Sequence, residues 1–348
     1  MMDKGSKIFI AGHRGMVGSA IHRRLEACGY NNIVARGHRE LDLTRQKDTE
    51  DFFDRERPAY VFLAAARVGG ILANSTYTAD FIYQNIMIAS NVVQASYRSG
   101  VKKLLNLGST CIYPRLAPQP LKEGSLLSGQ LEPTNEAYAI AKISAIKLCR
   151  YYNEQYRTNF MSVMPTNLYG INDNYSFEGS HLLPAFIRKF HLAKLLRQND
   201  LGAIKADLQK RGAPVAYKGS ADDVAGALAS AGITAESLTL WGSGAPLREL
   251  LYADDLAEAC VYLMERYDAP AIGEFINLGT GEEMPIRDIA GLVRDVVGFE
   301  GDIRWDTSKP DGTPRKLADV TRANALGWKA RTALKDGVRL AYKDYLGV

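Results

Sequence analysis

The feature that most constrains the fold lies near the start of the chain, where an apolar run meets a cluster of glycines. Residues 7–11 (KIFIA) have the length and composition of a buried strand, and the sequence GHRGMVG follows at residues 12–18. A helical pattern then continues to Ala27. Chains that bind a dinucleotide place its pyrophosphate at such a strand–turn–helix junction. We therefore predict a dinucleotide-binding unit here, although Gly12-x-x-Gly15-x-x-Gly18 is also compatible with a simple turn.

Further strands and helices are expected to alternate along the chain. The apolar runs that predict strands lie at residues 33–35, 60–64, 103–107, 162–164 and 275–278. Stretches with helical periodicity lie at residues 46–57, 79–99, 135–156, 182–197, 254–266 and 285–297. This alternation predicts an α/β fold, a Rossmann-type doubly wound parallel sheet with a smaller mixed α/β domain. We expect residues 1–170, completed by 252–282, to form the dinucleotide-binding domain, and residues 171–251 and 283–348 to form the second domain.

One segment of the second domain differs from its surroundings. Residues 200–238 have the pattern of two short helices joined by a linker with proline and glycine, and we assign no chemistry to them. Residues 68–71 and 309–316 are expected to be loops. A short strand at residues 303–305 and a helix beginning near Thr332 complete the expected elements.

Composition excludes several classes of protein. The net charge is +4 and no basic run occurs, which argues against nucleic-acid binding. No apolar run reaches membrane-spanning length, so we expect no membrane contact. The five histidines form no H-x-x-x-H pair and the four cysteines have neither metal-ligand spacing nor a disulfide pattern, so we expect no metal. Scattered cysteines fit a reducing compartment, and we expect a cytoplasmic protein.

Basic residues follow the second expected strand, where NAD-binding chains usually carry an acidic residue for the ribose 2′-hydroxyl. Arg36 and Arg39 stand there, and Arg14 lies within the glycine turn. Cations at this place favour the 2′-phosphate of NADP(H). Glu40 leaves NAD open, and a solvated basic loop is the plainer interpretation, but the balance favours NADP(H).

A tyrosine and a lysine lie four residues apart in the helix expected at residues 135–156. Tyr138 and Lys142 therefore share one helix face, one turn apart. An ammonium beside a phenol lowers the pKa of the phenol and makes it a usable proton donor. The spacing is common, so two surface residues on an amphipathic helix remain the alternative from this motif alone.

Two further reactive side chains follow the strand expected at residues 103–107. Active sites of open α/β sheets lie beyond the carboxyl ends of the strands. Ser109 and Cys111 are therefore candidates for chemistry. The plainer interpretation of Cys111 is a small buried hydrophobe.

Five features in order now resemble the extended short-chain dehydrogenase/reductase family. They are the glycine turn, three alanines at residues 64–66, Ser109, Tyr138-x-x-x-Lys142 and the run PTNLYG at residues 165–170. More narrowly, GHRGMVG, GSTCIYP at residues 108–114, and residues 135–142 and 309–316 resemble the branch that converts GDP-4-keto-6-deoxy-D-mannose to GDP-L-fucose. The similarity covers nearly the whole chain. Many members have a shorter connection in place of residues 200–238, and this longer segment resembles one found in some bacterial relatives.

The resemblance implies an enzyme that epimerises the sugar at C3 and C5 and then reduces the C4 ketone with NADPH. Tyr138 is implied as the proton donor, Lys142 as the residue that lowers its pKa and holds the nicotinamide ribose, and Ser109 as a hydrogen-bond donor to the carbonyl. Cys111 and His181 are implied as the base and the acid of the epimerisation. Without the resemblance, His181 is simply a loop histidine near the start of a helix.

The resemblance also implies the binding residues. Those for NADP(H) are Gly12, His13, Arg14, Gly15, Met16, Val17, Gly18, Arg36, Asp42, Leu43, Ala64, Leu107, Gly108, Ser109, Lys142, Pro165, Thr166, Asn167, Leu168 and His181. Those for the GDP-sugar are Lys189, Trp241, Arg248 and Asp311, with core packing an almost equal alternative for Trp241.

The helices expected at residues 79–99 and 135–156 are apolar over more of their surface than one sheet face needs. We therefore expect a homodimer formed by four helices, which the resemblance also implies. Two other functions stay open. One is a C4 reductase of a related GDP-4-keto-6-deoxy sugar, of heptose or talose type. The other is a non-catalytic dinucleotide sensor, against which the presence of Ser109, Tyr138 and Lys142 together argues.

Overall fold

The computed structural model describes residues 2–218, 220–309 and 311–348, and the chain forms two compact units. Unit 1 consists of Met1–Gly170, Glu249–Glu282 and Leu317–Thr332. Unit 2 consists of Ile171–Arg248, Glu283–Lys316 and Ala333–Val348. The division differs from the expected boundaries at two places, because residues 249–251 and 317–332 group with unit 1.

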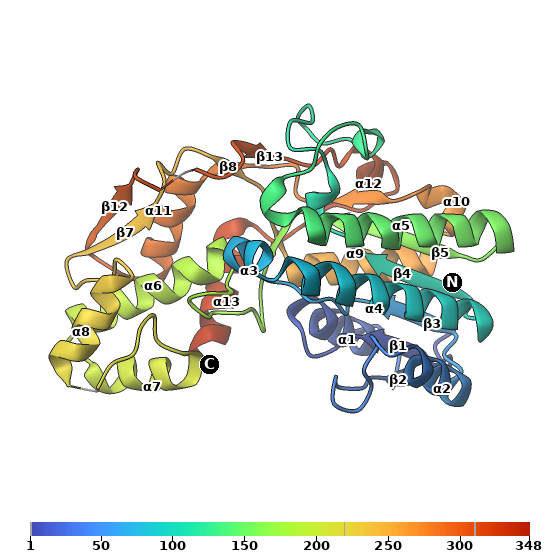
Figure 1. Cartoon of the computed structure of the whole chain (residues 1–348), viewed down its shortest axis with the longest axis horizontal. Helices are drawn as coiled ribbons and strands as arrows, with labels where there is room; N and C mark the ends of the chain where they lie inside the picture. Colours follow the sequence, from blue (N-terminus) through green and yellow to red (C-terminus); the bar gives the residue numbers. More distant parts are fainter. Residues whose placement is uncertain (1, 219, 310) are drawn as a thin grey trace. The chain divides into compact units, whose positions relative to one another are not determined.

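A six-stranded parallel sheet forms the centre of unit 1 (Figure 1). Its strands are β1 (Ile8–Ala11), β2 (Ile33–Val34), β3 (Tyr60–Leu63), β4 (Lys103–Leu107), β5 (Phe160–Pro165) and β10 (Ile276–Leu278). The spatial order is β10-β5-β4-β3-β1-β2, so the chain adds β2 on one side of β1 and the later strands on the other. The expected Rossmann-type doubly wound sheet is confirmed.

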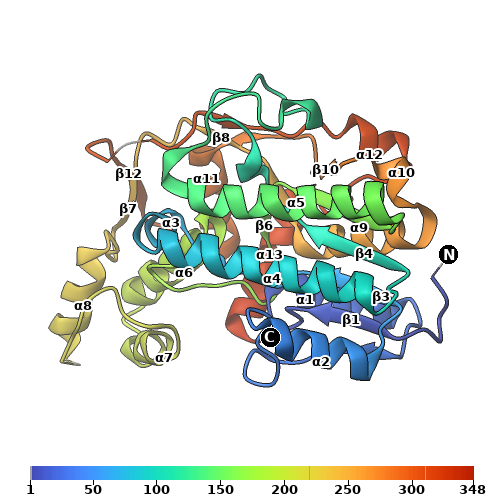
Figure 2. The same cartoon turned by 45° about the vertical axis from the view of Figure 1, so that its right-hand side comes forward.

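Alternate residues of the strands point to opposite faces, and helices cover both faces. Ile8 and Ile10 belong to one core cluster, whereas Phe9 and Ala11 belong to another. The helices on the first face are α1 (Met16–Ala27) and α9 (Ala253–Arg266), and those on the second are α2 (Gln46–Glu56), α4 (Thr78–Arg98) and α5 (Glu136–Tyr156). Helices α4 and α5 lie side by side in Figures 1 and 2.

Several short elements of unit 1 were not predicted. Helix α3 (Ile71–Thr76) begins in the expected loop at residues 68–71, and β6 (Asn167–Tyr169) pairs with β9 (Leu250–Tyr252). The others are α10 (Ala269–Ile272), α12 (Thr321–Ala325) and 3₁₀ turns at Thr110–Ile112, Glu123–Ser125 and Pro133–Asn135. Elements this short contain too few residues for a periodic pattern, and strand β6 depends on a partner far along the chain.

Unit 2 is smaller and mixes helices with short strands. Helix α6 (Leu182–Arg197) packs against α11 (Ile286–Val297), and α13 (Leu334–Leu346) also packs on α11. The strands are β7 (Ser237–Trp241) beside β12 (Asp302–Asp306), and β8 (Leu247–Arg248) between β11 (Met284–Pro285) and β13 (Arg315–Lys316).

The segment at residues 200–238 contains α7 (Leu201–Arg211) and α8 (Ala221–Ser230). The two short helices predicted there are therefore confirmed; Gly219, in the linker between them, lies outside the described residues. Within the part of the chain that the structure describes, no helix has both the length and the apolar character needed to cross a membrane.

Candidate active site

The glycine turn has no room for side chains at two of its positions. Gly12 follows β1 at a φ of +86°, and a Cβ atom there would lie 2.7 Å from the backbone nitrogen of Ala65. A Cβ atom on Gly18 would lie 2.1 Å from the carbonyl oxygen of Gly12. Between them, His13 and Arg14 complete the turn, and Gly15 immediately precedes the first residues of α1, Met16 and Val17. Because a helix N-terminus leaves N–H groups without helical acceptors, the turn presents donors that suit a phosphate.

The arginines predicted near a 2′-phosphate have different surroundings. Arg36 donates to Glu56 on α2, with 3.0 Å between Nη2 and Oε1. Arg14 lies over Gly37 after β2, since a Cβ atom on Gly37 would be 2.9 Å from the guanidinium carbon. The Arg14 guanidinium is also 3.9 Å from the carboxylate of Glu40. Arg36 is thus turned toward α2, and Arg14 crosses the loop beyond β2.

Three other predicted cofactor residues are fixed by backbone and side-chain bonds in unit 1. The Asp42 carboxylate accepts from the N–H and the hydroxyl of Thr44, at 3.0 and 2.7 Å. Leu43 is buried, and its carbonyl accepts from Asn91 of α4 at 2.9 Å. The N–H of Ala64 donates to the last carbonyl of β1 at 3.0 Å, which extends the pairing of β3.

Lys142 and Cys111 lie together beyond the carboxyl end of β4. Lys142 is 8% exposed, and its Nζ donates to the carbonyl oxygen of Leu107 at 2.7 Å. Gly108 follows, with its N–H bonded to β5 at 2.8 Å. Ser109 then caps the 3₁₀ turn that holds the buried Cys111, and its hydroxyl oxygen accepts from the Cys111 N–H at 3.4 Å. The sheet therefore holds a serine, a thiol and an ammonium at one strand end.

Burial controls the protonation of the lysine and the tyrosine. It lowers the pKa of Lys142 to about 8, against an opposing effect of the Cys111 charge. It raises the pKa of Tyr138 above its usual range, and the Cys111 charge adds to this rise. The Lys142 Nζ lies over the Tyr138 ring, 5.7 Å from its centroid. Burial therefore sets the direction of the Tyr138 pKa in the free protein, and the effect of Lys142 on a Tyr138 phenolate stays a prediction.

The run at residues 165–170 leads from the end of β5, at Pro165, into β6. The N–H of Thr166 bonds to the carbonyl of Leu278, whereas its buried hydroxyl oxygen has no hydrogen-bond partner among the described residues. Asn167 donates from Nδ2 to the carbonyl of Glu249 at 2.9 Å, and Leu168 packs on the core. A buried hydroxyl without a partner costs about 1–3 kcal/mol. A polar group of a bound cofactor at Thr166 would remove that cost.

Two of the predicted residues lie at the start of α6 or within it, in unit 2. His181 precedes the first residue of this helix, and although the residue is exposed, desolvation lowers the pKa of its ring. Lys189 is half-buried on the same helix, and burial lowers the pKa of its ammonium. A diphosphate near Lys189 would favour its charged form and offset this burial.

Three more predicted residues lie close to one another in unit 2. Trp241 ends β7 and is 73% exposed, so the alternative of core packing is wrong. Two residues later, Ser243 donates its N–H and its hydroxyl to the Asp311 carboxylate, at 2.8 and 2.7 Å. Arg248 ends β8 and donates to the carbonyl of Thr313 at 2.7 Å. Pro310, which belongs to the predicted loop at residues 309–316, lies outside the described residues.

Two buried charged residues were not predicted to matter. The Glu249 carboxylate is fully buried and accepts from the N–H groups of Gly281 and Ala318, each at 2.8 Å. Arg188 is 1% exposed in the middle of α6. The sequence could have indicated both residues, since each is a charged residue within a mainly apolar run. A charge in such a run needs a partner when the run is buried.

Reactive side chains beyond the strand ends of a doubly wound sheet, at the edge that also carries a glycine turn, are typical of enzymes that use a dinucleotide. The chain belongs to the NAD dependent epimerase/dehydratase family, whose model matches residues 8–211 and 212–279. The resemblance to the extended short-chain dehydrogenase/reductase enzymes is thereby confirmed.

Individual relatives are similar over nearly their full length. GDP-L-fucose synthase 1 of Arabidopsis thaliana is 51% identical over 99% of this chain and 95% of its own. GDP-L-fucose synthase of Escherichia coli (strain K12) is 47% identical over 98% of this chain and 96% of its own. A GDP-D-glycero-L-gluco-heptose synthase from Campylobacter jejuni, solved in the presence of NADPH, is 39% identical with a TM-score of 0.92, covering 99% of this chain and 100% of that one.

Proposed function

We propose that this chain catalyses NADPH-dependent 3,5-epimerisation and 4-reduction of GDP-4-keto-6-deoxy-D-mannose, giving GDP-L-fucose. The observation that carries the proposal is the buried Cys111 thiol in the 3₁₀ turn after β4, against which α5, the helix of Tyr138 and Lys142, packs. A plain reductase needs the tyrosine and the lysine but has no use for a thiol beside them. The names of the relatives at 47% and 51% identity support the same activity.

The residues of unit 1 fit NADP(H). Gly12 and Gly18 keep the turn open to a pyrophosphate, and the hydroxyl of Thr166 offers a buried polar atom. We assign the 2′-phosphate to Arg14 before Arg36, because the Arg14 guanidinium lies over Gly37 in the loop after β2, whereas Arg36 is turned toward Glu56 on α2. When bound, NADPH supplies the hydride that reduces C4. The similar Campylobacter jejuni enzyme was solved with this cofactor.

Tyr138 is assigned the proton for the C4 oxygen. Because burial raises its pKa, the phenol keeps its proton until an alkoxide, which is more basic, develops on the sugar. Lys142 carries its charge at pH 7 and stabilises the phenolate that remains. Ser109 accepts from the Cys111 N–H, which leaves its own hydroxyl proton for the carbonyl oxygen of the substrate.

Epimerisation needs one group to remove a proton and another to return one on the opposite face. The C4 ketone acidifies the neighbouring C3 and C5 positions, so one pair of residues can serve both carbons. Cys111 is the base in this proposal, and the charge of Lys142 favours its thiolate. His181 of unit 2 returns the proton. Because desolvation lowers the pKa of His181, a smaller fraction of its rings carries the proton at neutral pH than for an ordinary histidine. This fraction falls further as the pH rises.

The residues of unit 2 provide chemistry for the GDP half of the substrate. Arg248 and Lys189 are cations whose pKa values burial lowers, and a diphosphate would compensate both. The exposed Trp241 offers a flat apolar surface to the substrate. Asp311 fixes Ser243 and lies near Arg248, so we assign it to holding this part of the site.

A second function is C4 reduction of a related GDP-4-keto-6-deoxy sugar, of heptose or talose type. It is favoured by the TM-score of 0.92 to the Campylobacter jejuni heptose synthase. That enzyme is 39% identical to this chain, against 51% for the Arabidopsis synthase, so we rank C4 reduction alone as the second proposed function.

We also infer a cytoplasmic homodimer. Helices α4 and α5, side by side in Figure 1, carry exposed apolar and aromatic side chains, among them Tyr83 (62%), Ile140 (39%) and Tyr151 (53%). Two copies meeting through these helices would form a four-helix interface. The four cysteines are free, which suits a reducing compartment.

The test is incubation with NADPH and GDP-4-keto-6-deoxy-D-mannose, with the product identified by NMR. GDP-L-fucose is the expected product. A GDP-6-deoxysugar that retains the original C3 and C5 configurations would mean a plain 4-reductase. No NADPH consumption with this sugar, but turnover of a heptose analogue, would favour the second function.

A further inference from the structure

Helix α7, in the segment at residues 200–238, is joined to the loop at residues 172–180 by buried charges. That loop leads directly into His181 at the start of α6. The guanidinium of Arg188, two turns into α6, lies where α7 and the loop meet. All of these elements belong to unit 2.

Arg188 makes four hydrogen bonds that connect the two segments. Its Nε donates to Asp207 Oδ1 of α7 at 2.8 Å, and its Nη1 donates to the carbonyl of Tyr175 in the loop at 2.9 Å. The remaining two reach the last carbonyls of α7, those of Arg211 and Gly212. A cation at a helix C-terminus is favoured by the carbonyls that have no helical partner there. Four of the five N–H donors of the guanidinium are thus used.

The charge of Asp207 is shared by further partners. Its Oδ2 accepts from Nη1 of Arg211 at 2.8 Å and from the hydroxyl of Tyr345 at 2.6 Å. Replacing Arg188 therefore does not leave the carboxylate without partners. The Arg188 guanidinium also lies over the ring of Phe177, 4.2 Å from its centroid, which adds a second contact with the loop.

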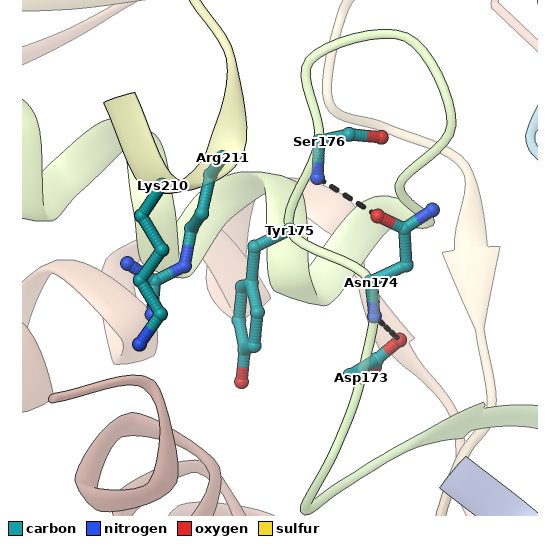
Figure 3. A pocket seen from close by; sticks show the side chains of 6 residues that line it. All are labelled: Asp173, Asn174, Tyr175, Ser176, Lys210 and Arg211. Atoms are coloured by element: carbon teal, nitrogen blue, oxygen red, sulfur yellow. Dashed lines mark hydrogen bonds between the residues drawn. The ribbon is translucent and has the colours of Figure 1, made fainter. Parts of the chain in front are cut away.

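The loop has a cavity beside it where it faces the end of α7. Figure 3 shows the cavity, of about 360 Å³, with Lys210 and Arg211 on one side and the loop residues 173–176 on the other. The loop is compact in itself, because the N–H of Ser176 bonds to Asn174 and the N–H of Gly179 bonds to Ser176.

We propose that Arg188 is a positioning residue for His181, and that α7 serves to hold Arg188 in place. Arg188 joins the loop before His181 to the helix that His181 begins, whereas the bond from the Tyr175 hydroxyl to the Ala341 carbonyl joins the loop to α13. Removing Arg188 takes away its bond to the Tyr175 carbonyl and its contact with the Phe177 ring, the contacts that tie the loop to α6 itself. The proposal rests on the proposed function in taking His181 as the proton donor of the epimerisation.

Arg188→Met tests this directly, with Arg188→Lys as the conservative variant and Val224→Ala as the control. Val224 is fully buried on α8 and takes no part in these bonds, so its truncation weakens the same segment without touching the loop. Amide hydrogen exchange of residues 172–181, NADPH binding and solvent deuterium entering C3 and C5 are measured for each.

In Arg188→Met, we expect the amides of Ser176, Gly179 and Ser180 to exchange about tenfold faster. We expect deuterium incorporation into the sugar to fall at least about tenfold, as a misplaced catalytic group predicts. NADPH binding should be unchanged. Arg188→Lys should recover part of both effects, and Val224→Ala should lower thermal stability with neither effect.

Three results decide against the proposal in different ways. Unchanged loop exchange in Arg188→Met overturns the role of Arg188 in holding the loop. Faster loop exchange with normal deuterium incorporation means that Arg188 only supports the structure. No deuterium incorporation by the unaltered enzyme overturns the proposed function and the role of His181 with it, whereas the loop exchange still reports the connection to α7.

Discussion

The dependence of ketone reduction on pH tests the role given to Lys142. Burial lowers its pKa to about 8, and its ammonium is bonded to the carbonyl of Leu107 at 2.7 Å. The charged form, present below this pKa, is the one that stabilises the Tyr138 phenolate. A group with a pKa of about 8 is roughly 90% charged at pH 7 and roughly 10% charged at pH 9. We therefore predict that kcat/KM for reduction falls about tenfold between these two values.

The assay follows the loss of NADPH absorbance with the GDP-keto sugar from about pH 6 to pH 10. Lys142→Arg is the control, because a guanidinium stays charged throughout this range. Whatever the residual rate of Lys142→Arg, its kcat/KM for reduction should not fall between pH 7 and pH 9. Tyr138 does not produce a fall near pH 8, because burial raises its pKa above the usual range.

A rate that stays level to pH 9 would refute the reasoning, since the charge of Lys142 would then be unimportant. The same alkaline fall in Lys142→Arg would also refute it, by assigning the fall to another group.

Three other predictions concern the tyrosine, the cofactor and the assembly. Tyr138→Phe should reduce the ketone about 10²–10⁴ times more slowly while binding NADPH normally; near-normal turnover would remove it from the mechanism. Arg14→Glu should raise the KM for NADPH and leave the KM for NADH unchanged. Arg36→Gln should raise the KM for NADPH by less, because Arg36 is bonded to Glu56. A preference of the unaltered chain for NADH would contradict both expectations. Light scattering at micromolar concentration should give a dimer, and Ile140→Arg should give a monomer; a monomeric unaltered chain would exclude the interface.

Much of unit 1 follows from local patterns in the sequence. The glycine turn could be placed because Gly12 and Gly18 allow the close approaches seen around them, and no other residue type does. Strand β4 and the residues after it were predicted because buried parallel strands are short apolar runs. The pair Tyr138 and Lys142 followed from helix periodicity alone.

Properties that depend on distant neighbours were not predictable in the same way. The partner of Arg36 is Glu56 on another element, so the sequence could not tell that this cation faces α2. The raised pKa of Tyr138 depends on how deeply the tyrosine is buried, which a lysine one turn away in the sequence does not reveal. The role of Arg188 depends on Asp207, in a segment whose pattern showed helices and nothing else.

The most direct test of the central claim is solvent deuterium incorporation at C3 and C5 of the sugar by the unaltered enzyme and by Cys111→Ser. The account predicts that the unaltered enzyme places deuterium at both carbons. It predicts that Cys111→Ser places none, while NADPH still reduces the ketone to a product with the original C3 and C5 configurations. An unaltered enzyme that incorporates no deuterium, or a Cys111→Ser variant that incorporates it normally, would contradict the account.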